Sequence, residues 1–186
     1  MQVIIIGGGA SGLMAAITAV RNGRQVTLLE RQARVGRKLL ATGNGRCNLT
    51  NQNMGLPYYH GQAPDFARPA LEALDLDATL DFFHSLGLLT TAEDNGRVYP
   101  YSDQAGSVLD VLRFAADAAG VMTRTGFEVT GLKRGKKGFL VSSAEETLPA
   151  DRVIVCCGGM AGGKLGGTRS GYELLQALGH SVTKLY

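Results

Sequence analysis

The sequence has few cysteines, and their spacing fits neither a disulfide framework nor a zinc site. Its 186 residues include Cys47, Cys156 and Cys157, and no CxxC motif. Because the number is odd and the motif is missing, we expect reduced thiols and no metal centre. For Cys47 we expect a packing role in preference to redox chemistry, since it has no CxxC partner.

Long apolar runs are also missing. No stretch approaches the roughly 18 residues of a membrane-spanning helix, and the N-terminus enters a β-branched run at once, without the basic segment of a signal peptide. We therefore expect a cytoplasmic protein without a membrane partner. The net charge of +3 is too small to indicate nucleic-acid binding by itself.

The stretch from Val3 to Glu30 predicts one βαβ unit. A buried strand at 3–6 runs directly into a glycine-rich turn, a helix at 13–20 follows and ends at Asn22-Gly23, and a second strand at 25–29 ends in Glu30. Strand, glycines, helix, strand and acid in this order predict a dinucleotide-binding unit.

The turn has the spacing GxGxxG. Gly7 permits a tight turn, Gly9 lets the backbone approach a pyrophosphate, and Gly12 lets the helix pack close to the strand, while Ala10 and Ser11 lie at the start of the helix. The positive end of the helix stabilises phosphate, and Glu30 is placed to accept a ribose 2′-hydroxyl.

A long basic loop follows from residue 31 to 53. Residues 21–50 hold seven cations against the single acid Glu30: Arg21, Arg24, Arg31, Arg34, Arg37, Lys38 and Arg46. We interpret the cluster mainly as recognition of cofactor phosphate; a solvated basic face and a polynucleotide groove remain alternatives.

The remaining pattern alternates helices and strands. We expect two short amphipathic helices in 64–86 with core-facing residues such as Phe66, a short extended piece at 96–101 and a helix from Ser102-Asp103 to 119–120. Next come a parallel strand at 121–125, an antiparallel meander at 127–133, 138–143 and 146–149, a buried strand from Asp151 to Gly159, and a helix at 171–178. Close approach of the backbone to the cofactor explains Gly158.

Four segments carry a resemblance to a known family. They are GGGASGLMAA at the N-terminus, GRKLLATGNGRCNLTN at 36–51, GRVYPYSDQAGSVLDVL at 96–112, and VIVCCGG with GYELLQALGH near the end. In these the chain resembles the two-domain FAD flavoproteins described as aminoacetone-oxidase-like or bile-acid-reductase-like NAD(P)/FAD-dependent oxidoreductases. It departs from their usual GxTGDGYE at 166–173, where Arg169 and Ser170 replace Gly and Asp.

The resemblance implies an α/β fold and a set of contacts. The fold is a Rossmann-type FAD-binding domain, glutathione-reductase-like, with a parallel sheet, a β-meander crossover and flanking helices. By the resemblance, Glu30 and Arg31 hold the adenosine ribose, Arg37 and Lys38 lie along the pyrophosphate, and the Val129 backbone lies against the adenine. The residues that approach the flavin are Asn44, Gly45, Arg46, Cys47 and Asn48.

The function expected from these features is that of an FAD-binding oxidoreductase with NAD(P)H as possible electron donor. Residues 1–186 would form one incomplete cofactor domain, because family members carry a further substrate domain and a C-terminal segment that completes the FAD site. No acid–base pair is evident, so the sequence assigns no catalytic residue, no particular small-molecule substrate and no oligomeric state. The alternatives are a nicotinamide dehydrogenase, a non-catalytic dinucleotide-binding module and a flavin-dependent RNA-modifying enzyme; the lack of clustered aromatics disfavours the last.

Overall fold

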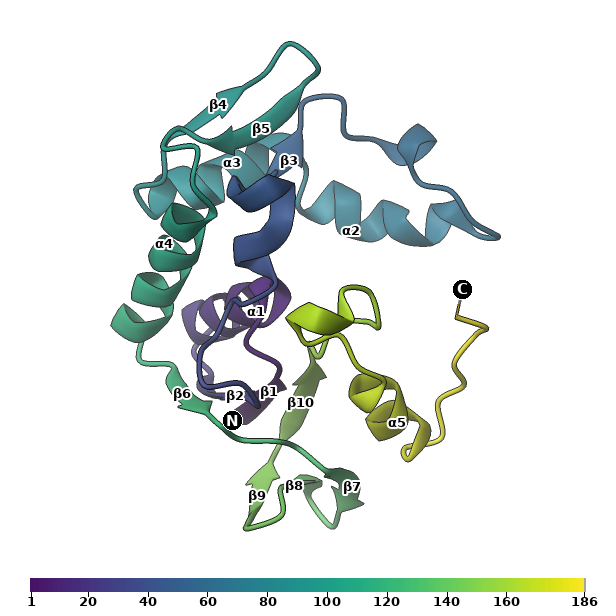
Figure 1. The fold of residues 1–186 in the computed structure, drawn as a ribbon. Coiled ribbons are helices and arrows are strands. Elements are labelled where there is room, and N and C mark those ends of the chain that lie inside the picture. Colours follow the sequence, from purple (N-terminus) through teal and green to yellow (C-terminus); the bar gives the residue numbers. More distant parts are fainter. Residues whose placement is uncertain (186) are drawn as a thin grey trace. The chain divides into compact units, whose positions relative to one another are not determined.

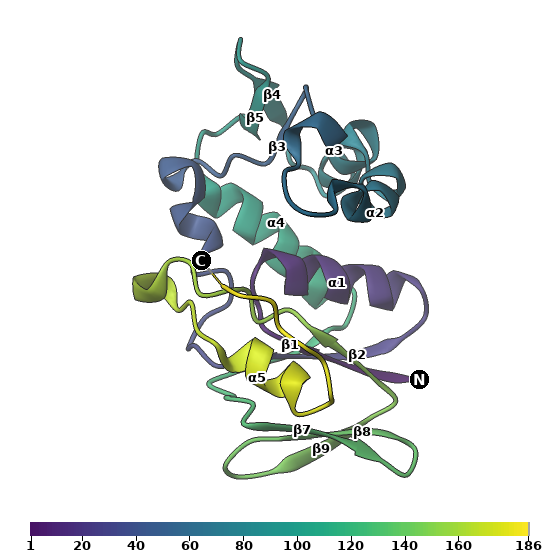
Figure 2. The same cartoon turned by 90° about the vertical axis from the view of Figure 1, so that its right-hand side faces the viewer.

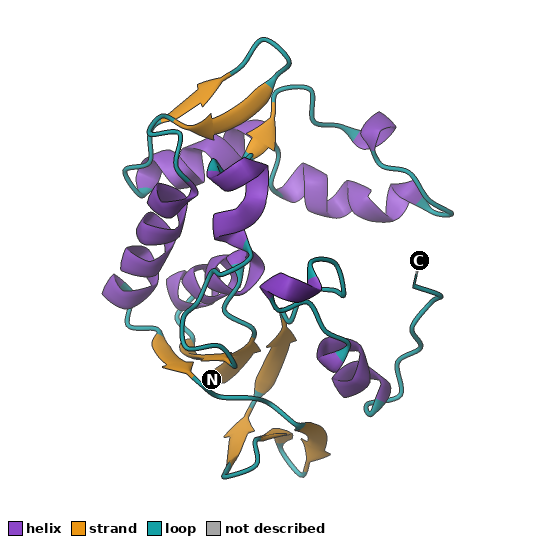
Figure 3. Ribbon diagram, viewed as in Figure 1, coloured by secondary structure: helices purple, strands orange, loops and turns teal. Residues whose placement is uncertain are grey.

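The computed structural model describes residues 1–185, which divide into two compact units. The first comprises residues 1–39 and the described residues from 112 onward, and the second comprises residues 40–111. Figure 1 follows the chain through both, and Figure 3 distinguishes their helices and strands. The two boundaries between the units fall inside elements: one in the 3₁₀ segment η1 (Leu39–Gly45) and the other in α4 (Ala105–Ala118).

The first unit is built on a parallel sheet with the order β10-β1-β2-β6. Its strands are β1 (Gln2–Ile6), β2 (Gln25–Glu30), β6 (Met122–Thr125) and β10 (Arg152–Val155). All three pairings are parallel, which confirms the predicted α/β fold with the βαβ unit at its centre. The helix α1 (Ala10–Arg21) connects the two central strands and buries Leu13, Ala16 and Ile17.

An antiparallel meander lies on the opposite face of the sheet from α1 (Figure 2). It consists of β7 (Gly131–Gly135), β8 (Gly138–Ser142) and β9 (Thr147–Ala150). Between sheet and meander lies a buried apolar cluster: Ile4, Ile6, Leu29, Phe127, Val129, Leu132, Val141, Ala150 and Leu174. Leu174 comes from α5 (Ser170–Gln176), which follows the short 3₁₀ segment η4 (Gly163–Leu165).

The second unit combines a small sheet with short helices. Its antiparallel sheet has the order β3-β5-β4, with β3 (Thr50–Asn51), β4 (Thr90–Ala92) and β5 (Arg97–Pro100). The helical segments are η2 (Leu56–Tyr58), η3 (Pro64–Ala67), α2 (Arg68–Ala73) and α3 (Leu76–Ser85). The two helices predicted in 64–86 are therefore confirmed, and the Asp75 side chain caps α3 by accepting from the Ala78 amide at 2.9 Å.

Several details of the prediction were wrong. Phe66 is 88% exposed and does not pack in a core. The loop expected over 31–53 contains η1 and β3. The helix α4 begins at Ala105 because Asp103 takes a left-handed conformation (φ 57°) in the turn after Pro100. The strand β10 is shorter than 151–159 and lies at the sheet edge, where Ile154 is partly exposed.

Among the described residues, no helix combines the length and the hydropathy needed to cross a membrane.

The close contact between α1 and the first turn generates a stability prediction. A Cβ built on Gly12 would lie 1.8 Å from the Gly7 carbonyl oxygen, so Gly12→Ala must push helix and turn apart. We expect it to lower the free energy of unfolding by about 1–3 kcal/mol in urea denaturation. Gly106→Ala in α4 is the control, since its Cβ would meet no atom within 4 Å. A loss at Gly106 as large as that at Gly12 would contradict the steric explanation.

Candidate dinucleotide-binding site

The turn after β1 requires glycine at its first position. Gly7 has φ 107°, and its amide donates to the Leu29 carbonyl at 2.7 Å. A Cβ on Gly7 would lie 2.4 Å from the carbonyl oxygen of Cys156, so the turn is also packed against the end of β10. A side chain is excluded here both by backbone conformation and by space.

Gly9 faces open space at the start of α1. A Cβ built on this residue meets nothing within 4 Å, and no side chain caps the helix. The amides of Ala10 and Ser11 belong to the first turn, whose N–H groups have no intrahelical acceptor, and this turn carries no acid. The positive end of α1 is thus suited to an anion.

Glu30 fastens the turn to the loop that follows β2. Its two carboxylate oxygens accept from the amides of Gly8 at 2.7 Å and Gln32 at 2.8 Å. Each oxygen keeps a further lone pair, so the carboxylate can also accept a ribose hydroxyl. That role stays a prediction, whereas the structure shows that Glu30 already fixes the glycine turn.

The segment before the meander is held against the end of β2. Phe127 donates to the Glu30 carbonyl and Gly126 to the Gln32 carbonyl, both at 2.9 Å. Val129 follows with its side chain in the apolar cluster. Contrary to the prediction, Val129 precedes β7 and is not a strand residue. Its main chain therefore precedes the strand ladder, and its contact with adenine stays a prediction.

Three cations predicted to follow the ribose and pyrophosphate hold a glycine-rich segment of the same unit. Arg31 donates to the Gly166 carbonyl at 2.5 Å, Arg37 to the Lys164 carbonyl at 3.1 Å, and Lys38 to the Ala161 carbonyl at 2.8 Å. The sequence reasoning missed this segment; its signal was the density of glycines at 158–167.

Gly158 begins the same segment with φ 71°, and a Cβ there would lie 3.9 Å from the Lys38 ammonium. The structure thus brings Gly158, Arg31, Arg37 and Lys38 together. Among residues 1–185 these cations contact carbonyl groups and pair with no carboxylate, so the group remains attractive to phosphate.

The residues predicted to approach the flavin all lie in the second unit. They are Asn44, Gly45, Arg46, Cys47 and Asn48. Three of them, Asn44, Gly45 and Cys47, have positive φ, and a Cβ on Gly43 would lie 2.6 Å from the Asn48 amide nitrogen. These contacts make the segment a tightly folded loop, and its contact with a flavin stays a prediction.

Two tyrosines of the second unit, Tyr99 and Tyr101, differ in exposure. Tyr99 is buried beneath the Arg46 guanidinium, which lies 3.9 Å from its ring centroid, whereas Tyr101 is 73% exposed. Tyr99 is thus a packing residue of the second unit.

The thiols are held in their neutral form. Burial raises the pKa of Cys47 against the opposing effect of a hydrogen bond with Thr42, and it raises the pKa of Cys156 against a hydrogen bond with Ser11. For Cys157, burial and the neighbouring Cys156 raise the pKa to about 11. The expected packing role of Cys47 agrees with its buried position.

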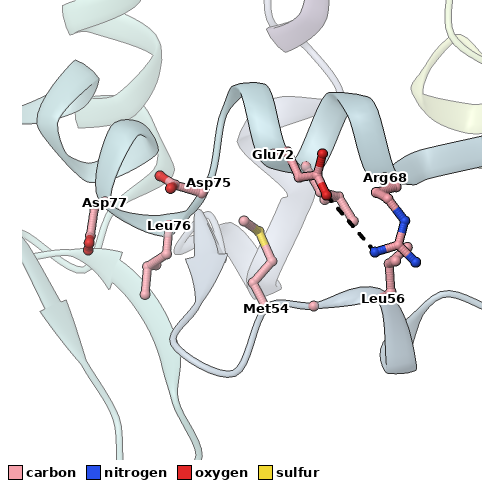
Figure 4. A pocket seen from close by; sticks show the side chains of 9 residues that line it. Met54, Leu56, Arg68, Glu72, Asp75, Leu76 and Asp77 are labelled. Carbon is pink, nitrogen blue, oxygen red and sulfur yellow. Dashed lines mark ion pairs between the residues drawn. The ribbon is translucent and has the colours of Figure 1, made fainter. Parts of the chain in front are cut away.

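A separate cavity of about 550 Å³ lies within the second unit (Figure 4). Met54, Leu56, Leu71 and Leu76 give it apolar walls, and Arg68 pairs with Glu72 at 3.9 Å beside it. None of the residues predicted for cofactor binding lines it. Its carboxylates are partly engaged, because Asp75 caps α3.

A comparison with protein families decides the relationship. The profile described as HI0933-like protein Rossmann domain matches residues 1–185. The chain belongs to this family. The family resemblance inferred from the four sequence segments is thereby confirmed.

The relatives of this chain carry names that describe different activities. The chain is 48% identical over 184 residues to a 3-dehydro-bile acid delta(4,6)-reductase of Clostridium scindens, covering 98% of this chain and 45% of the relative. It is 28% identical to a ribosomal RNA dihydrouridine synthase of Escherichia coli, covering 97% and 45%. The chain therefore spans about half the length of these relatives.

Solved structures support the fold. THI4 of Thermovibrio ammonificans has a TM-score of 0.60 at 18% identity, covering 97% of this chain and 63% of that one. A 3-ketosteroid-delta4-(5alpha)-dehydrogenase of Rhodococcus jostii has a TM-score of 0.58 at 16% identity, covering 86% and 46%. At these identities the likeness confirms the Rossmann-type architecture of the family.

The open space at Gly9 generates a binding prediction. Gly9→Val should abolish dinucleotide binding while the chain stays folded, because its Cβ would meet no protein atom within 4 Å and the side chain would occupy the space proposed for the phosphate. Circular dichroism and calorimetric titration with ADP check both parts. Gly106→Val, also in open space, is the control and should bind ADP like the parent chain. Retained ADP affinity in folded Gly9→Val would refute the assignment.

The raised thiol pKa values predict slow alkylation. Since the thiolate is the reactive form and burial favours the thiol, native Cys157 should react with iodoacetamide far more slowly than free cysteine at pH 8 and speed up toward pH 11. Mass spectrometry of tryptic peptides against pH measures this for each cysteine. Reaction of Cys157 at pH 8 at the rate of free cysteine would contradict the buried, neutral thiol.

Proposed function

We propose that this chain is the cofactor-binding part of an FAD-dependent oxidoreductase that takes electrons from NAD(P)H. The observation that carries the proposal is the turn from Gly7 to Gly12, where an uncapped helix terminus faces open space beside a carboxylate held by Gly8. Helix termini of this kind bind pyrophosphate, and a following acid favours an adenosine ribose.

The residues of the first unit fit the ADP half of FAD. The amides of Ala10 and Ser11 would hold the pyrophosphate, the Glu30 carboxylate would accept the ribose hydroxyls, and the Val129 main chain would face the adenine. Arg31, Arg37 and Lys38 add positive charge near the phosphates. When bound, the flavin supplies hydride transfer, and the chain supplies binding and orientation.

The choice of FAD over a nicotinamide dinucleotide rests on the loop after Glu30. It is long, basic and glycine-punctuated, which suits an extended cofactor. The signature segment at 36–51 supports the same choice, because it resembles the corresponding segment of the FAD flavoproteins.

Substrate class and cell location belong to the same proposal. The name of the 48% identical relative makes a steroid acid of the bile-acid type the first substrate to assay. Three unpaired thiols fit a reducing, cytoplasmic compartment. A second candidate, RNA modification, is favoured by two relatives at 28% and 27% identity described as ribosomal RNA dihydrouridine synthases.

Ligand selectivity tests the proposal. ADP and FAD should both bind in calorimetric titrations, and FMN should not, because the described first unit offers contacts to the adenosine diphosphate moiety that FMN lacks. Glu30→Ala should weaken the binding of ADP and of FAD by about 1–3 kcal/mol, since the buried ribose hydroxyls lose a charged acceptor. FMN binding as tight as FAD binding, or no binding of ADP, would contradict it. Binding of ribosomal RNA fragments with no affinity for steroid acids would favour the second candidate.

A further inference from the structure

The helix α2 has few apolar contacts with the rest of its unit. Within Arg68–Ala73 no residue is buried, and Leu71 is the only one that is half-buried. A helix of this length does not persist in water through its own hydrogen bonds, so it needs apolar contacts along one face. Leu71 lines the cavity of the second unit. The one partly covered side of α2 therefore faces a cavity and not a packed core.

The walls of this cavity are apolar and lie within one compact unit. Met54 and Leu56 come from the segment around η2, Leu71 comes from α2, and Leu76 comes from the start of α3. All four residues are half-buried, and every lining residue belongs to 40–111. The volume of about 550 Å³ falls within the range of about 300–1,000 Å³ found for small-molecule sites. The cavity therefore has the size and the apolar surface that a small organic ligand requires.

Charge is unevenly distributed along the cavity (Figure 4). At one end Arg68 contacts Glu72 at 3.9 Å and Asp65 at 2.6 Å, so its positive charge is compensated. At the other end lie Asp75 and Asp77. Three acids and one base line the cavity, which gives a formal charge of −2. The negative charge that remains is at the end with the two aspartates.

These two aspartates can accept hydrogen bonds from a ligand. Asp75 uses Oδ1 to accept from the Ala78 amide, and its Oδ2 remains for another donor. Asp77 is exposed and pairs with no cation among residues 1–185. An ammonium group beside them would make charge-assisted hydrogen bonds, whereas a carboxylate or a phosphate would be repelled.

We propose that this cavity binds an organic cation, whose ammonium lies at Asp75 and Asp77 and whose apolar body lies over Met54, Leu56 and Leu71. The site is independent of FAD binding. Its acids disfavour a steroid acid or a nucleotide, so its ligand differs in charge from the cofactor and the substrate proposed above. A bound ligand supplies α2 with the apolar contacts that the chain itself does not provide.

Three probes that share one phenylalkyl chain and differ in the terminal group test the site: phenylbutylammonium, phenylbutanol and phenylvalerate. In NMR titrations of the ¹⁵N-labelled chain, phenylbutylammonium should shift the amides of residues 54–56 and 71–77. It should bind about ten-fold more tightly than phenylbutanol, and phenylvalerate should not bind measurably. Added salt should reduce the preference for the ammonium over the alcohol. Amide hydrogen exchange of residues 68–73 should slow when the ammonium is bound, because α2 gains apolar contacts.

The variant Asp77→Asn separates recognition of charge from the shape of the cavity. It should weaken the binding of phenylbutylammonium about three- to five-fold and leave the binding of phenylbutanol unchanged. Asp94→Asn is the matched control, because Asp94 is an exposed aspartate between β4 and β5 of the same unit and does not line the cavity. This control should bind all three probes like the parent chain.

Equal affinity for the ammonium, the alcohol and the carboxylate would overturn the proposal, as would equal effects of Asp77→Asn and Asp94→Asn. Ammonium-induced shifts that spare residues 54–56 and 71–77 would also overturn it. If the same residues shift when the protein concentration is raised without a probe, a second copy of the chain occupies the cavity, and the proposal is wrong.

Discussion

The structure depends on the contact between the Gly7 carbonyl and the backbone of Gly12. A Cβ at position 12 would lie only 1.8 Å from this oxygen. Strand β1 and helix α1 therefore approach more closely than any side chain at position 12 would permit. This approach places the start of α1 directly after the strand and leaves its first amides uncapped. Glu30 and Gly36 then hold the turn by contacts with the two backbone groups of Gly8. The binding site proposed here follows from that contact.

Charge is used differently in the two units. In the first, Arg31 and its neighbours donate to carbonyls of the glycine-rich segment, so their positive charge is kept while their position is fixed. In the second, Arg46 meets two carboxylates, so its charge is neutralised and its shape matters more. Both arrangements hold a glycine-rich segment in place through side-chain contacts. Four of the seven cations of the basic cluster therefore fall into two groups with different kinds of partner.

The sequence predicted the parts of the fold that local patterns determine. The βαβ unit, the meander and the two short helices followed from periodicity and glycines, and the roles of Gly7 and Gly12 followed from their spacing. Long-range contacts could not be predicted in this way. Nothing local shows that Arg46 pairs with Glu93 and Asp103, at separations of 47 and 57 residues, or that Phe66 stays exposed. Val129 was misplaced because its β-branched neighbourhood resembles a strand, although the segment is held by the end of β2 and enters the ladder only at Gly131.

We propose that the uncapped turn at the start of α1 binds the phosphates of an adenine dinucleotide. Chemical-shift changes in ¹⁵N-labelled chain on addition of ADP test it most directly, because each backbone amide reports its own surroundings. The largest shifts are expected at Gly9, Ala10 and Ser11, with further changes at Glu30 and Val129. Shifts confined to the cavity around Met54 and Leu71, with none at the turn, would contradict it.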